Sequence, residues 1–330
     1  MFFIGIAQKQ KTLSEAKVST TVRSDLKTIF TGARASTGTA SLIDLVGKDV
    51  EYSCSGYSVG NLNPAQEGIS FSPGLIKGFK VTVWSKDWSL PYRISNMLFV
   101  TSPNIKYVLV GNSQLAKEMN KSLPPNFLSK GNTKQALLTK EMQTDTNQIV
   151  NDGNYRIRLI FFNHDPVGTE GLLNINIMED SEVSAVNIVG NSLDSYGELR
   201  FYQKKSDRWS LPKGTSYYLG RESLYGALFT DDYKSYDCNM RRAFKRMAFV
   251  SEIYIKRAAM LQQAYQQSAD TACATQLSLA LDSLNTLKTN ANTLAESFPA
   301  QQPIAALFQA SSSLKTRNEQ LQRLSCSEVY

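Results

Sequence analysis

The residues best suited to chemistry in this chain are polar side chains that follow apolar runs. Its single histidine, His164, stands beside Asp165, and two more carboxylates, Asp231 and Asp232, follow another apolar run. A histidine near carboxylates can act as a general base or hold a metal ion. These four residues form the catalytic set that an enzyme built on an α/β sheet would use.

The string VGNS supplies a second set of polar residues because it occurs twice. Asn112 and Ser113 end its first copy, and Asn191 and Ser192 end its second. Each copy follows an apolar run, where glycine and asparagine tolerate a left-handed turn and serine can cap the next element. A structural turn explains the string fully, and a binding site at the carboxyl ends of the strands is the alternative. Neither GxGxxG nor GxxxxGK[ST], the glycine-rich patterns that cradle phosphates, is present.

The string WSLP, at 88–91 and 209–212, also occurs twice and provides Trp88 and Trp209. Its two copies are spaced differently from those of VGNS, so one tandem duplication cannot account for both strings. An exposed pair of indole rings could grip a sugar or a peptide. Core packing of both rings is the favoured interpretation.

The four cysteines, Cys54, Cys238, Cys273 and Cys326, are isolated from one another in the sequence. Structural zinc sites use short Cys/His pairs, so we expect no metal, and no sequence motif calls for another cofactor. An even number of isolated cysteines is typical of disulfides in an oxidising compartment, and four buried free thiols are the alternative.

Helix geometry favours one disulfide pairing. Cys238 and Cys273 begin two successive predicted helices, so roughly 30 helical residues, or about 45 Å, lie between them. A disulfide needs Cα atoms within about 7 Å, which excludes that pair. The last predicted helix runs back toward Cys273 and brings Cys326 near it. By elimination, Cys54 would pair with Cys238 and join the sheet to the helices.

Apolar periodicity predicts the elements that must position these residues. A stripe of apolar residues predicts an amphipathic helix over 8–34, and β-rich segments follow in VEYSCSGYS, GISFSP and GFKVTVW. A helix over 114–122, capped by Ser113, precedes a polar segment over 129–153. The remaining strands are predicted at 106–110, 155–162, 172–178, 184–189, 198–204 and 223–229. Residues 237–268 and two later leucine-rich stretches predict three helices, with a break at 298–303.

This order of elements predicts an α/β fold: a mixed, partly parallel, Rossmann-like sheet followed by a C-terminal three-helix array. The expected parts are an N-terminal helix over 1–39, a sheet domain over 40–235 and a helical domain over 236–330. The first residues, MFFIGI, are far fewer than the ~20 apolar residues that cross a bilayer. They indicate either a start that packs on the core or the end of a membrane anchor, which requires a span before Met1.

The charge balance of 36 Lys+Arg against 29 Asp+Glu gives a net charge of +7. This charge would suit nucleic acid, an anionic membrane or an acidic polymer. The densest basic patch, Arg241, Arg242, Lys245 and Arg246, lies on a predicted helix. A solvated helix face is the favoured interpretation over a phosphate-binding stripe, so nucleic acid is not an expected partner.

Three segments carry a resemblance to known sequences. They are SFSPGLIKGFKVTVWSKDWSLPYRISNMLFVTSPNIKYVLVG, SLYGALFTDDYKSYDCNMRRAFKRMAFVSEIYIKRAAML and the final SCSEVY. Their succession resembles a group of uncharacterised archaeal proteins from small-genome lineages, which look like membrane-anchored surface proteins with one N-terminal span and a large outer domain. The resemblance covers residues 40–330 as a pattern of aromatic, proline and cysteine landmarks, and it implies no known activity.

The sequence therefore predicts an extracytoplasmic, non-enzymatic surface or pilus-associated protein with a structural or binding role. Its expected partners are another protein or further copies of itself at the cell surface. The alternative is an α/β hydrolase-type or nucleotide-binding enzyme with a site at the carboxyl ends of the strands.

Overall fold

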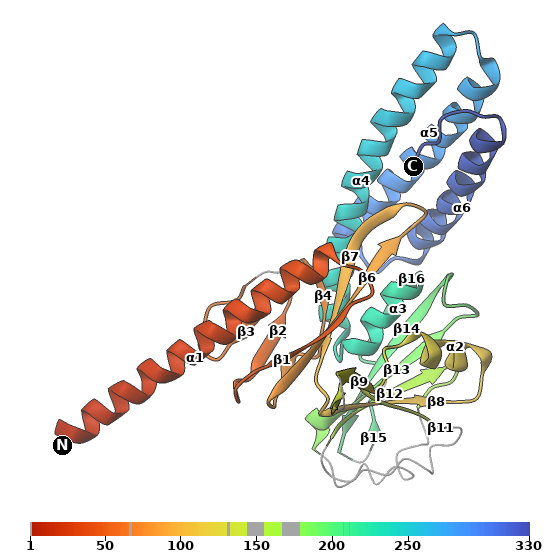
Figure 1. Ribbon diagram of the computed structural model, residues 1–330. Helices are drawn as coiled ribbons and strands as arrows, with labels where there is room; N and C mark the ends of the chain where they lie inside the picture. The colour runs from red at the N-terminus through yellow and green to blue at the C-terminus, as the bar shows by residue number, and fades with distance from the viewer. Residues whose placement is uncertain are drawn as a thin grey trace.

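The computed structural model describes residues 2–65, 68–130, 133–143, 155–166, 179–206, 208–210 and 212–330. Helix α1 (Phe2–Ala35) projects from one side of a body of β-sheets, and three long helices extend from another side (Figure 1). The fold is α/β, with mixed sheets, parallel strand pairs and a C-terminal helical array, as the sequence predicts.

The first sheet layer packs against the second half of α1. Its four strands have the order β1-β6-β7-β4, and a smaller sheet of order β3-β2-β5 lies beside it. Val22, Leu26 and Phe30 recur every four residues on α1 and are almost fully buried in the core of this layer. The strands are β1 (Ala40–Asp44), β2 (Val50–Ser53), β3 (Gly56–Val59), β4 (Ile69–Phe71), β5 (Leu75–Ile76), β6 (Lys80–Ser89) and β7 (Arg93–Thr101).

The second layer is a seven-stranded sheet of order β11-β8-β12-β13-β14-β15, in which β16 also pairs with β14. Strands β11, β8, β12 and β13 are mutually parallel, and β14 is antiparallel to β13 and β16. β8 and β12 are apolar and buried along most of their length, which is typical of parallel strands covered on both faces. The strands are β8 (Ile105–Val110), β11 (Thr139–Gln143), β12 (Arg156–Phe162), β13 (Val183–Val189), β14 (Tyr196–Lys205), β15 (Arg208–Trp209) and β16 (Gly214–Leu219).

Several predicted elements are confirmed. The N-terminal helix, the strands near 106–110, 155–162, 184–189 and 198–204, and helix α2 (Gln114–Ser122) are all present. The predicted polar segment over 129–153 instead contains the hairpin of β9 (Phe127–Lys130) and β10 (Thr133–Ala136), followed by β11. The predicted strand at 172–178 lies outside the described residues.

The predicted strand at 223–229 is wrong, because these residues form helix α3 (Arg221–Phe229). Every residue from Ser223 to Phe229 is buried, and a short apolar run that is buried on all sides carries no helical or strand period. Gly226 allows α3 to approach the first sheet closely, since a Cβ atom there would lie 2.8 Å from the ring of Phe71.

Three long helices complete the chain: α4 (Tyr233–Gln267), α5 (Thr271–Ser297) and α6 (Gln301–Arg323). Tyr236, Met240, Phe244 and Met247 recur on one side of α4 and are fully buried in the core that it shares with both sheet layers. Farther along, α4 packs on α5, and α5 packs on α6 (Figure 1). α4 therefore joins the sheets to the helical array.

Both disulfides predicted from helix geometry are confirmed. Cys54, in the turn between β2 and β3, pairs with Cys238 on α4, and Cys273 on α5 pairs with Cys326 beyond α6. The Cα atoms of each pair are 5.8 Å apart. Two such crosslinks are typical of proteins from an oxidising, extracytoplasmic compartment. Among the described residues, no helix combines the length and apolar character that crossing a membrane requires.

Candidate functional site

The parallel strands bring three of the predicted polar loops to one edge of the sheet. β8, β12 and β13 all end there, so the loops after Val110, Phe162 and Val189 are neighbours. A Cβ atom on Gly111 would lie 3.8 Å from Cε1 of His164. The sequence therefore predicted correctly that these loops lie at the carboxyl edge of the sheet. The hydrogen bonds of their side chains show whether the loops are structural.

Asp165 is held by residues of two adjacent strands. The Tyr202 hydroxyl donates to its Oδ1 at 2.5 Å, and the Asn187 amide donates to the same oxygen at 2.7 Å. Arg200 lies 3.3 Å from Oδ2. These interactions, the bond from Tyr202 above all, lower the pKa of Asp165. A carboxylate bound in this way fastens the loop to β13 and β14 and is a poor base.

His164 points its ring at its own strand. Its Nδ1 is 2.9 Å from the carbonyl of Phe162, which requires that nitrogen to donate, and its ring meets Phe161 edge-on. The neighbouring Asn163 exchanges two hydrogen bonds with the backbone of Gly190. These contacts shape the loop after β12.

The two VGNS strings form turns. Oγ of Ser113 accepts from the backbone N–H of Ala116 and caps α2, as predicted. Oγ of Ser192 accepts from the backbone N–H of Asp194, and its carbonyl accepts from the Tyr218 hydroxyl. Asn112 and Asn191 are exposed beside these serines. The contacts favour structural turns over a binding site at both copies.

Asp231 and Asp232 lie at the opposite edge of the sheet, so their predicted place beside His164 and Asp165 is wrong. α3 carries the chain back along the sheet, and Asp231 then lies 3.5 Å from Arg156 at the start of β12. Asp232 caps α4 by accepting from the backbone N–H of Ser235. The seven residues of β12 separate the two edges by about 20 Å. The four carboxylate and imidazole groups therefore do not form one catalytic site.

Both tryptophans of the WSLP strings are buried, which favours core packing over binding. Trp88 is fully buried, donates from Nε1 to the carbonyl of Leu219 at 3.2 Å and meets Phe244 edge-on. Trp209 is 7% exposed and belongs to a different core on the far face of the seven-stranded sheet. They do not form an exposed aromatic pair.

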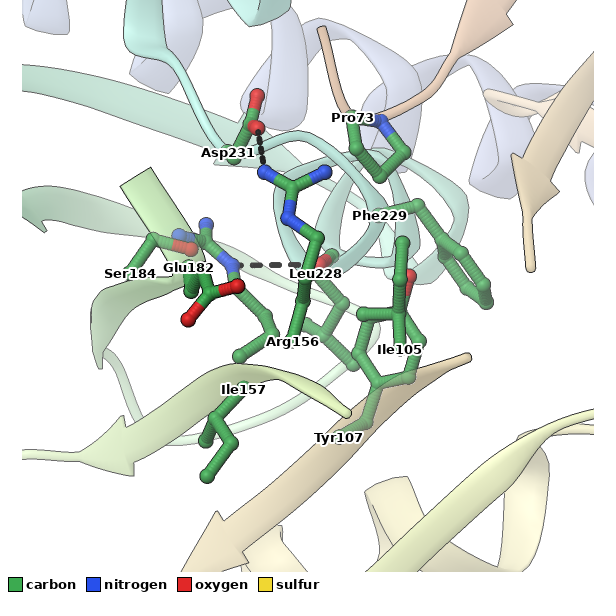
Figure 2. Close-up of a pocket in the computed structure, with 11 residues that line it drawn as sticks. Pro73, Ile105, Tyr107, Arg156, Ile157, Glu182, Ser184, Leu228, Phe229 and Asp231 are labelled. Atoms are coloured by element: carbon green, nitrogen blue, oxygen red, sulfur yellow. Dashed lines mark hydrogen bonds and ion pairs between the residues drawn. The ribbon is translucent and has the colours of Figure 1, made fainter. Parts of the chain in front are cut away.

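A groove of about 460 Å³ opens at the amino edge of the parallel strands, where no site was predicted. Asn104, Arg156, Glu182 and Asp231 are among the residues that line it. A narrow recess of about 20 Å³, which is room for one water molecule, adjoins this groove, because both are lined by Arg156, Glu182 and Asp231. Arg158 also lines the recess, and Figure 2 shows most of its lining residues. Two arginines on the same face of β12 thus dominate this edge.

Arg156 connects three elements at the rim of this groove. Its Nη1 donates to the carbonyl of Leu75 at 2.6 Å, and its Nη2 donates to the carbonyl of Ser181 and faces Asp231. Figure 2 shows its guanidinium group pointing toward Asp231. The positive charge is therefore neutralised within the protein.

Arg158 is 3% exposed and binds the carboxyl end of α3. It donates to the carbonyls of Ala227, Leu228 and Thr230, where the helix dipole is negative. Burial lowers its pKa to about 10. Among the described residues, its Nη1 and the Thr230 hydroxyl have no hydrogen-bond partner, and Arg158 lines the recess, where a water molecule could accept from Nη1. The arrangement is built to hold α3 on the sheet.

The sequence itself contains a pattern that predicts buried partners for these two arginines. In YRIRLIFF, two arginines alternate with apolar residues, and a strand places alternate residues on one face. Charged residues facing a core require buried partners, and a helix end supplies them.

No group of metal-ligating side chains is found among the described residues. Comparisons with protein-family models, curated proteins and solved structures found nothing that matches this chain.

Proposed function

We propose that this protein is an extracytoplasmic, non-enzymatic structural or binding protein of the cell surface, and that α1 attaches it to a surface assembly of the pilus type. In this proposal the sheets and the helical array form the outer body. The apolar start of α1 makes the contact with further copies of the chain or with another protein.

The observation that carries the proposal is the projection of α1 from the body (Figure 1). Leu13 is 67% exposed, whereas Ser19 and Val22, farther along the helix, are buried against the sheets. Residues 2–17 extend the helix by about 24 Å beyond that contact. A helical rod gains little stability without a packed face, so this half of α1 is suited to burial in a partner.

The two disulfides also support the proposal. Cys54–Cys238 fixes the start of α4 to the first sheet layer, and Cys273–Cys326 closes the helical array. Crosslinks of this kind suit a protein that stays folded outside the cell, where thiols are oxidised.

Sedimentation of the full chain tests the role of α1. We expect the purified protein to form large assemblies, and we expect a variant with Phe2, Phe3, Ile4 and Ile6 replaced by Gln to sediment as a monomer. The matched control also introduces four Gln residues, in place of large apolar side chains that are exposed on the body: Phe79, Phe127, Ile253 and Met260. The control should assemble like the wild type.

Flotation with lipid vesicles separates self-assembly from membrane attachment. Assembly without flotation supports protein–protein contact through α1, and flotation that depends on the same four residues supports a membrane anchor. A wild-type chain that remains monomeric and does not float would contradict the proposal.

A further inference from the structure

A second groove, of about 580 Å³, lies along the start of α4 beside the Cys54–Cys238 disulfide. Its lining includes Lys234, Arg241, Arg242 and Lys245, all from α4, and Ala295 from α5. Among the described residues that line it, Asp237 is the one acidic side chain. The Asp237 carboxylate accepts a hydrogen bond from Ser216 at 2.5 Å, and it is one negative charge against four positive ones. The groove therefore has a strong excess of positive charge.

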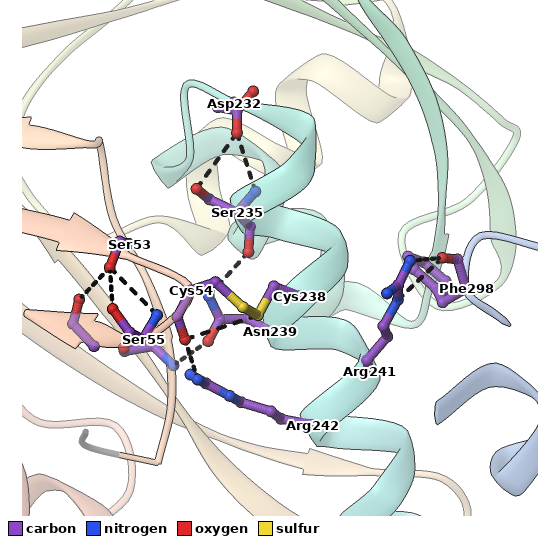
Figure 3. The surroundings of a disulfide bond; sticks show 12 residues. Ser53, Cys54, Ser55, Asp232, Ser235, Cys238, Asn239, Arg241, Arg242 and Phe298 are labelled. Carbon is purple, nitrogen blue, oxygen red and sulfur yellow. Dashed lines mark hydrogen bonds between the residues drawn. A yellow bond between two sulfur atoms is a disulfide. The ribbon is translucent and has the colours of Figure 1, made fainter. Parts of the chain in front are cut away.

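Within the described part of the chain, none of these four cations forms an ion pair. Arg241 donates twice to the carbonyl of Phe298, and Arg242 donates to the carbonyl of Cys54. Figure 3 shows these two side chains pointing to opposite sides of α4. Carbonyl oxygens orient the guanidinium groups without neutralising them, and the Asp237 carboxylate, which interacts electrostatically with Arg241, offsets at most one of the four positive charges.

The positive surface continues along α4. Arg246 follows Lys245 directly and lines a third cavity of about 360 Å³, together with Arg34 and Arg93. This cavity has no acidic lining residue among those described. Arg93 and Arg246 form no ion pair with any described residue. From Lys234 to Arg246 the cations cover about 18 Å of helix. The surface is thus elongated.

We propose that this surface, made of Lys234, Arg241, Arg242, Lys245, Arg246 and Arg93, binds a linear acidic polysaccharide that bears carboxylate or sulfate groups. These cations extend along α4 without an ion pair among the described residues, which matches a polymer with repeated negative charges. The arginines, already oriented by backbone carbonyls, can use their remaining N–H groups to hold carboxylate or sulfate oxygens.

The shape and lining of the grooves favour a sugar polymer over a nucleic acid. Single-stranded nucleic acid is bound by several aromatic rings on which successive bases stack, whereas Tyr233 is the one aromatic residue in the described lining of both cavities. Acidic sugar chains are also the polyanions found at cell surfaces. The choice of a polysaccharide therefore rests on the extracytoplasmic placement proposed above, while the anion-binding surface rests on the groove alone.

Binding of polygalacturonate and heparin to the purified full chain tests this inference by calorimetry at low salt. The test variant is Lys234→Gln/Lys245→Gln/Arg246→Gln, whose side chains are exposed and donate no hydrogen bond to any described residue. The matched control, Lys117→Gln/Lys315→Gln/Arg323→Gln, removes the same charge from exposed positions on α2 and α6. We expect the test variant to bind about tenfold more weakly or worse, and the control to lose less than threefold.

Four results would overturn the inference. The first two are no binding of either polymer by the wild type and an equal loss of affinity in both triple variants. The other two are tighter binding of oligo-dT than of either polysaccharide, and binding of neutral dextran with the same affinity as the acidic polymers. The result is independent of α1, because a chain that fails to assemble can still bind the polymer, and one that assembles can fail to bind it. Failure here and failure of the proposed function are therefore distinguishable.

Discussion

The seven-stranded sheet and the start of α4 both carry many polar side chains, but they use them in opposite ways. At the sheet edges, Asp165, Arg156 and Arg158 are bonded to groups of the protein itself. Along α4, Lys234 and Lys245 form no hydrogen bond or ion pair with any described residue, and Lys234 only lies over the ring of Tyr233. Polar groups that the fold satisfies build structure, and charges that it leaves uncompensated are available to a ligand.

This contrast also shows why strand-end residues are weak evidence for an active site. The backbone N–H and C=O groups of a loop that follows a buried strand need hydrogen-bond partners. Ser113, Asn163 and Ser192 supply such partners here. The same residue types would be present with or without a ligand. Substitutions at the sheet should therefore change stability alone, and substitutions along α4 should change binding.

Removing the two disulfides separately gives the largest expected effects. Loop closure predicts a loss of about 5 kcal/mol in the free energy of unfolding for Cys54→Ala/Cys238→Ala, and about 4 kcal/mol for Cys273→Ala/Cys326→Ala. Only the first pair adjoins the groove, where Arg242 donates to Cys54. Urea unfolding and calorimetry with polygalacturonate should show both variants less stable and only the first binding more weakly. An equal loss of polygalacturonate binding in the two variants would show that binding does not depend on the groove.

Arg158→Met should have the next largest effect, and on stability alone. The substitution leaves three carbonyls at the end of α3 without their buried donor, which costs about 3 kcal/mol. Urea unfolding followed by circular dichroism measures this loss. Arg317→Met, at a position on α6 away from the sheet, is the control. A loss below about 1 kcal/mol would show that Arg158 does not hold α3.

Asp237 should make stability depend on pH near neutrality. Burial raises its pKa to about 7, opposed by the bond from Ser216 and by Arg241, while Asp232 adds to the rise. Because the folded pKa lies above that of the unfolded chain, the folded state binds the extra proton between about pH 7 and pH 4. The melting temperature should therefore rise by a few degrees as pH falls from 8 to 5. Asp237→Asn should remove this dependence, and an unchanged slope would contradict the assignment.

Ser113→Ala should have the smallest effect of the series. It removes the N-cap of α2 and should lower the free energy of unfolding by about 1 kcal/mol. Polysaccharide binding should be unaffected, because Ser113 lies outside both basic cavities. Ser113→Asp, which keeps a capping oxygen, should restore stability. Weaker polysaccharide binding by either variant would indicate that the carboxyl edge of the seven-stranded sheet takes part in binding.

The sequence predicted the long elements and the disulfides because their patterns depend on local geometry. The spacing of apolar residues defines α1, α4 and the strand β12, and helix lengths alone excluded a bond between Cys238 and Cys273. Helix α3 was mistaken for a strand because its surroundings, including Phe71 and Arg158, come from distant parts of the chain. That error then moved Asp231 and Asp232 to the wrong edge.

The basic surface was visible in the sequence only as a cluster on a helix. Its two cavities are completed by Cys54, Ala295 and Arg93, which the fold brings to α4 from three separate segments. Composition and periodicity do not contain this information. The sequence shows where the cations are but not which carboxylates lie beside them after folding. The cations without ion pairs can be recognised only from the ion pairs of the folded chain.

Labelling with diethyl pyrocarbonate, which modifies both lysine and histidine, compares the two regions in one experiment. Lys234 and Lys245 report on the groove, exposed His164 reports on the carboxyl edge, and exposed Lys117 is a control. In the presence of polygalacturonate, we predict that mass spectrometry finds Lys234 and Lys245 protected and His164 and Lys117 modified as before. Protection of His164 with Lys234 and Lys245 still modified would contradict the account.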